Sequence, residues 1–98
     1  MPSVADLVEP GSLRERAGEY LARAGDVLRS SGRVRLDDFG QTRVAASVDD
    51  GGSRSVVLES RSSALITSCT CGGVTEDGLC PHIVATAFET WERAPERR

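Results

Sequence analysis

All three cysteines of this chain and its only histidine lie between residues 69 and 82, as Cys69-x-Cys71, eight further residues and then Cys80-x-His82. Alternate side chains on a strand point to the same face, so the sulfurs of Cys69 and Cys71 can reach one point. Pro81 is typical of the first position of a helix, where partial positive charge favours nearby thiolates. Three thiolates and one imidazole form a closed tetrahedral zinc shell. The pattern predicts one structural Zn²⁺ ion held by these four side chains.

The same residues are compatible with other chemistry. Cysteine is often an inert buried side chain. A Cys69–Cys71 disulfide would be strained and would leave one cysteine over. A Cys–His nucleophile pair is a further alternative, although no third group to orient it is evident in the sequence. The ligand spacing favours zinc, and a four-ligand zinc has no open position for water, so we expect no enzymatic activity.

A helix over residues 12–31 is predicted by its capping signature and its periodicity. Ser12 followed by Glu15 has the spacing of a capping box. Gly18 and Gly25 weaken the helix by about 1 kcal/mol each relative to alanine, but their small size lets it lie close against a sheet. The apolar positions recur at intervals of three and four, as Leu13, Ala17, Tyr20, Leu21, Ala24 and Leu28.

The middle of the chain alternates polar and apolar residues and predicts an antiparallel meander of about four strands. Turn residues at Asp37–Gly40 separate the first strand from the second, and turn residues at Asp49–Gly52 separate the second from the third. The expected strands are 33–36, 44–48 (with Val44, Ala46 and Val48 on one face), 55–59 and 64–71. A last helix near 81–93 follows, with apolar residues at Val84, Ala87, Phe88 and Trp91.

These elements predict an α+β fold with an N-terminal helix, a small antiparallel sheet and a zinc-binding ββα unit that ends in a C-terminal helix. A short helix over 3–9, capped by Ser3, and the turn pair Pro10-Gly11 precede the first long helix. The expected divisions are a lead-in at 1–11, a zinc-binding domain at 12–93 with its zinc unit at about 64–92, and a frayed tail at 94–98.

Length and charge narrow the class of protein further. A chain of 98 residues forms one domain with a thin core, and such domains often need a metal. Twelve arginines against 15 acidic residues give a net charge of −3, which argues against a high-affinity nucleic-acid binder. No apolar run approaches the roughly 18 residues of a membrane helix, and the N-terminus does not resemble a signal peptide. We expect a cytoplasmic protein without a membrane partner, in a reducing compartment where cysteines often bind metals.

The four-ligand spacing, with strands before it and an apolar helix after it, resembles the SWIM zinc finger family. The similarity extends upstream through Arg16–Tyr20, Gly32–Val34 and Val44–Val48, and covers about residues 12 to 92. The resemblance implies zinc ligands at the four Cys and His positions and a ββα zinc unit inside a larger protein, such as a helicase-like ATPase. It also implies DNA binding or protein–protein contact. Pro81 stands where the family often has lysine, which removes a possible phosphate contact.

Two surfaces could bind a partner. Arg33, Arg35 and Arg43 could form a basic stripe on DNA or RNA, with weak binding expected, or belong to a mixed-charge solvated face. Phe88 and Trp91 could form a protein-docking patch, or pack on the sheet and cover the zinc unit. Tyr20 is expected in the core with its hydroxyl at the edge, and Glu76-Asp77 in a solvated turn. The predicted function is a zinc-stabilised interaction module associated with nucleic acid, with protein docking as the alternative and no small-molecule substrate.

Overall fold

The computed structural model describes residues 4–62, 64–75 and 78–93. The elements are α1 (Val4–Leu7), α2 (Pro10–Ser30), β1 (Val34–Phe39), β2 (Arg43–Asp49), β3 (Ser53–Arg61), β4 (Ala64–Cys69) and α3 (Pro81–Arg93). The strands form one antiparallel sheet in the order β1-β2-β3-β4. The predicted α+β fold and its meander are confirmed. The Ser3 cap, the Glu76-Asp77 turn and the 94–98 tail lie outside the described residues.

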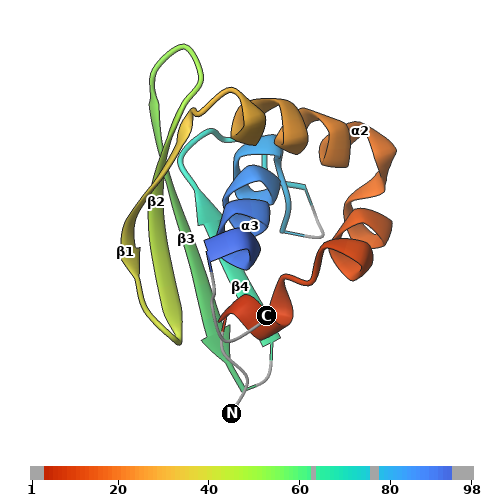
Figure 1. The fold of residues 1–98 in the computed structure, drawn as a ribbon, viewed down its shortest axis with the longest axis vertical. Helices are drawn as coiled ribbons and strands as arrows, with labels where there is room; N and C mark the ends of the chain where they lie inside the picture. The colour runs from red at the N-terminus through yellow and green to blue at the C-terminus, as the bar shows by residue number, and fades with distance from the viewer. Residues whose placement is uncertain (1–3, 63, 76–77, 94–98) are drawn as a thin grey trace.

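Helix α3 occupies the centre of the molecule. It contacts α2 on one side and all four strands on the other, so three layers share one core (Figure 1). A helix that is apolar on most sides is typically buried, and α3 is buried almost throughout from His82 to Phe88. Phe88 is therefore a core residue, and Trp91 is partly buried against the same core. The sheet contributes its inner face through Val44, Val48, Val56 and Leu58.

The strands differ from the prediction at two places that bear on the site. Residues 37–39 continue β1 instead of turning, because a bulge between Leu36 and Asp38 absorbs the extra residue. The predicted turn at Asp37–Gly40 is therefore wrong. Strand β4 ends at Cys69, so Cys71 lies in the following turn and not on the strand as predicted.

The start of α2 also differs from the prediction. Glu9 is the N-cap, and its carboxylate accepts a hydrogen bond from the Ser12 amide at 2.7 Å. Pro10 occupies the first turn, where its missing N–H costs nothing. The predicted capping box at Ser12 and the turn at Pro10-Gly11 are wrong, because the acidic side chain one turn earlier satisfies the free amide. Before it, Val4 and Ala5 of α1 are buried, and so is Val8 in the connection to α2, so α1 packs into the core.

A bend at Gly18 divides α2 into two helical segments. Gly18 adopts φ 86° and ψ 163°, a backbone conformation that is open to glycine and rare for residues with a side chain. Leu13 and Leu28 of the predicted stripe are in the core and Ala17 and Leu21 pack against it, but the bend turns Tyr20 away from this face. Tyr20 is 82% exposed and not a core residue. The buried residues of α2 are Leu13, Ala22, Gly25 and Leu28.

Gly25 provides the close approach expected of a small residue, but to α3 and not to the sheet. A Cβ at this position would lie 2.6 Å from Val84 Cγ1 and 3.1 Å from the backbone nitrogen of Ala85. The second segment of α2 thus lies directly on the side of α3 that faces away from the strands. Among the described residues, no helix has the length and apolar character needed to cross a bilayer.

Candidate metal centre

Two elements deliver the four predicted ligands to one point. Cys69 ends β4 and Cys71 follows in the turn, while Cys80 and His82 flank Pro81 at the start of α3. The ligand atoms of the four side chains all lie within 4.8 Å of one another. Cys80 and His82 are buried, and Cys69 and Cys71 are half-buried. The predicted cluster is confirmed, and its three cysteines are free thiols.

The size of the cluster fits a zinc ion. His82 Nδ1 lies 3.8 Å from the Cys69 sulfur and 3.8 Å from the Cys80 sulfur. Zn–S bonds of about 2.3 Å and a Zn–N bond of about 2.0–2.1 Å imply a sulfur–nitrogen edge of about 3.6 Å in a tetrahedron. A Cys₃His donor set of this size suits one metal ion, and zinc is the ion that prefers it.

Backbone amides support two of the sulfurs. The Gly73 amide donates to Cys71 Sγ at 3.3 Å, and the Ile83 amide donates to Cys80 Sγ at 3.5 Å. Amide donors favour the thiolate form that a metal requires. The second of these amides belongs to the first turn of α3, where helix amides have no partner within the helix.

The protein environment sets different proton affinities for the three thiols. Burial raises the pKa of Cys80 to about 12, and burial also raises the pKa of Cys69. Burial acts in the same direction at Cys71, but the Gly73 amide and His82 overcome it and lower the pKa of Cys71 to about 7. A divalent cation displaces such thiol protons when it binds, so loading the site releases protons.

A carboxylate that sequence reasoning missed contacts the histidine. Asp50 Oδ2 lies 2.8 Å from His82 Nε2, on the side of the ring opposite the sulfurs. The sequence indicates only a hairpin turn at Asp49–Gly52, and nothing in the spacing points from that turn to a residue so far along the chain.

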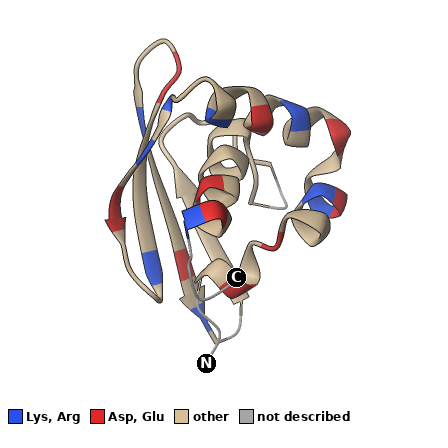
Figure 2. Ribbon diagram, in the orientation of Figure 1, with Lys and Arg blue, Asp and Glu red and all other residues tan. Residues whose placement is uncertain are grey.

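The structure brings together only two of the three predicted arginines. Arg33 and Arg35 line one shallow groove of about 510 Å³, whose other lining residues include Ser47 and Ser53. Arg43 begins β2, at the end of that strand opposite to Ser47 and the groove. Figure 2 shows acidic and basic residues mixed along these strands, without a uniformly basic face.

Nearby oxygens engage each of these arginines. Arg35 pairs with Asp37 at 2.8 Å, and Arg43 lies 3.7 Å from Asp38. Arg33 donates to the backbone carbonyl of Asp49 at 3.2 Å. The two carboxylates offset part of the positive charge that a phosphate would meet, and the Asp49 carbonyl occupies one donor of Arg33.

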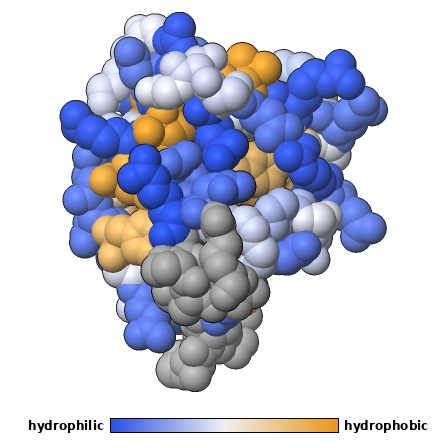
Figure 3. Space-filling view, in the orientation of Figure 1, coloured by the Kyte–Doolittle hydropathy of each residue, from blue (hydrophilic) through white to orange (hydrophobic). Residues whose placement is uncertain are grey.

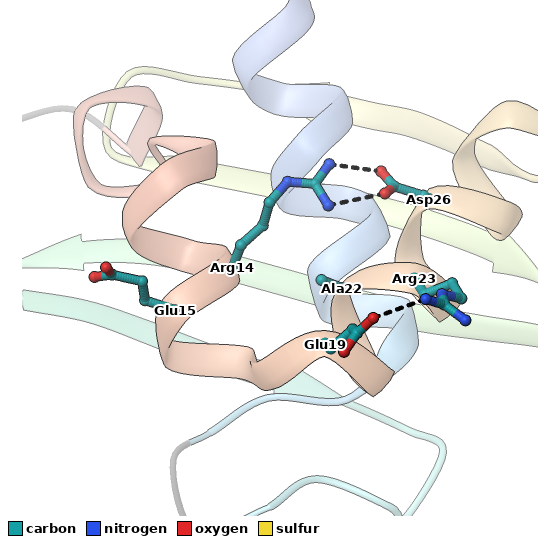
Figure 4. Close-up of a pocket in the computed structure, with 6 residues that line it drawn as sticks. All are labelled: Arg14, Glu15, Glu19, Ala22, Arg23 and Asp26. Carbon is teal, nitrogen blue, oxygen red and sulfur yellow. Dashed lines mark hydrogen bonds and ion pairs between the residues drawn. The ribbon is translucent and has the colours of Figure 1, made fainter.

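A hollow of about 480 Å³ lies in the bend of α2 (Figure 4). Arg14 forms two hydrogen bonds with Asp26 across the bend, at 2.9 and 3.0 Å, and Arg23 pairs with Glu19 at 2.8 Å. Arg14 also lies over the Phe88 ring, 4.6 Å from its centre. These charges tie the two segments of α2 to each other and to α3, so the hollow serves the fold.

An apolar groove of about 410 Å³ lies beside the metal centre. Its exposed apolar side chains are Tyr20 and Val27, which are 82% and 57% exposed. Elsewhere, the face drawn in Figure 3 carries separate apolar patches among hydrophilic side chains. The groove is lined by Tyr20, Arg23, Ala24, Val27, Leu28, Asp50 and Pro81.

No family model, curated protein or solved structure matches this chain.

Proposed function

We propose that this chain is a structural zinc module of SWIM type that docks onto a protein partner, as an accessory domain of a larger protein such as a helicase-like ATPase. The ligand spacing, with strands before it and an apolar helix after it, supports the SWIM assignment. Four protein ligands leave the metal no open position, which supports a structural role without catalysis.

The observation that carries the docking function is the exposed apolar groove beside the metal centre. Tyrosine is enriched at protein interfaces, because its ring supplies contact area and its hydroxyl a hydrogen bond. Pro81, between two metal ligands, lines the same groove. Asp50 also lines it, with 53% of its side chain exposed. The groove thus suits a protein segment that presents apolar side chains and one basic side chain.

A Tyr20→Ser substitution is expected to weaken partner binding by about 30-fold, the effect of a hot-spot residue worth about 2 kcal/mol. A photo-crosslinking amino acid at position 20 would identify the partner in cells, and titration of the purified partner would give the affinity. Phe39→Ser is the matched control, because Phe39 is 41% exposed at the far end of the sheet. An affinity equally affected by both substitutions, or by neither, would contradict the docking surface.

Weak nucleic-acid binding is a second candidate function, favoured by the groove that Arg33 and Arg35 share. Two phosphate contacts predict that log K falls against log salt with a slope near −2 on duplex DNA. Fluorescence anisotropy should show binding no tighter than roughly 10⁻⁵ M at physiological salt. The Arg33→Ala/Arg35→Ala double variant should lose this binding and Arg43→Ala should keep most of it. Nanomolar binding that survives the double substitution would refute this assignment.

A further inference from the structure

The side chain of Asp50 reaches the metal centre from a distant part of the chain. Asp50 lies in the turn between β2 and β3, 32 residues before His82. The turn is closed by a hydrogen bond from the Asp50 amide to the Gly52 carbonyl at 3.0 Å, and the Asp49 amide donates to the Arg33 carbonyl at 2.9 Å. These two hydrogen bonds support the backbone of the turn, and the Asp50 carboxylate lies against the ring.

The two nitrogens of His82 have different neighbours. Nε2 lies 2.8 Å from the Asp50 carboxylate, whereas Nδ1 lies 3.8 Å from each of two cysteine sulfurs. A neutral imidazole carries one proton, and an ionised carboxylate can only accept a hydrogen bond. A hydrogen bond from Nε2–H to an ionised Asp50 requires the Nε2–H tautomer, in which the lone pair of Nδ1 points toward the sulfurs.

We infer that Asp50 is a positioning residue for the metal centre, which holds His82 in the Nε2–H tautomer and directs Nδ1 to the zinc ion. Carboxylates in this position fix the orientation of a ligand ring and raise its basicity. The side chain of His82 is only 8% exposed, so Asp50 is the polar group that anchors the buried ring from the solvent side. The inference rests on the metal centre and is independent of the docking function.

The removal of the carboxylate tests this role. Asp50→Ala is expected to weaken Zn²⁺ binding about 10- to 100-fold, measured by competition with a chromophoric chelator. Asp50→Asn should recover most of the loss, because the amide oxygen can still accept from Nε2–H. Asp49→Ala is the matched control, since it removes the adjacent exposed carboxylate at the end of β2.

A second measurement reads the tautomer directly in the wild-type protein. Long-range ¹H–¹⁵N spectra of the zinc-loaded chain should show His82 with a metal-bound Nδ1 and a protonated Nε2. A metal bond at Nε2 would overturn the inference. So would Zn²⁺ affinity in Asp50→Ala within twofold of Asp49→Ala, or a wild-type chain that binds no zinc. A chain that binds zinc normally and has no protein partner would refute the docking function alone.

Discussion

Removal of zinc is expected to unfold the domain. Structural zinc contributes on the order of 10 kcal/mol or more in small metal-binding domains, which is comparable with the whole stability of about 5–15 kcal/mol of an ordinary domain. The metal joins the end of β4 to the first turn of α3, and α3 is the helix on which α2 and the sheet both pack. Loss of this junction therefore removes the anchor of the central helix.

Thermal melts followed by circular dichroism, with and without a zinc chelator, measure this effect. The cooperative transition should be lost or shifted down by tens of degrees after chelation, and added Zn²⁺ should restore it. Cys80→Ser provides the matched control, because it replaces one fully buried ligand atom and little else. Chelator should cause no further change in that variant. A chelated wild-type protein that melts at the native temperature would contradict the structural role of the metal.

Substitution of Gly25 is expected to have the second largest effect. Alanine is favoured over glycine inside a helix by about 1 kcal/mol, yet Gly25→Ala should destabilise the protein by about 1–3 kcal/mol. The reason is that the added Cβ would lie 2.6 Å from Val84 Cγ1, and α2 and α3 would have to separate. Denaturant unfolding gives the change in free energy, and Glu15→Ala at an exposed position of α2 should have little effect.

A double substitution isolates the steric cause. In a Val84→Ala background the nearest methyl group is absent, so the cost of Gly25→Ala should fall by a measurable coupling energy. An unchanged cost in that background would show that the contact with the Val84 methyl group does not cause the destabilisation. A Gly25→Ala variant more stable than the wild type would refute the close approach itself.

The sequence predicted the sheet and the ligand set well, because both depend on short-range patterns. Alternation placed Val44, Ala46 and Val48 on a buried face, and the Cys-x-Cys and Cys-x-His spacings brought four ligand atoms together. The hairpin at Asp49–Gly52 was equally local and also holds.

The errors arose where glycine conformation or tertiary contacts decide the outcome. A helical pattern does not show that Gly18 will adopt a positive φ, so the orientation of Tyr20 was predicted wrongly. Glu9 is the cap instead of Ser12 because the helix begins at Pro10, so the Ser12 amide is itself one of the free amides of the first turn and donates to the Glu9 carboxylate. The contact between Asp50 and His82 depends on the packing of the β2–β3 turn against the start of α3, which no local pattern encodes.

The most direct test of the metal centre is X-ray absorption at the zinc edge, on protein purified without added chelator. One zinc per chain is expected, with three sulfur ligands at about 2.3 Å and one nitrogen ligand at about 2.0–2.1 Å. Folded protein that contains no zinc would contradict the structural zinc site. A zinc ion with a water oxygen in place of one of the four protein ligands would also contradict it, because the site would then be open to chemistry.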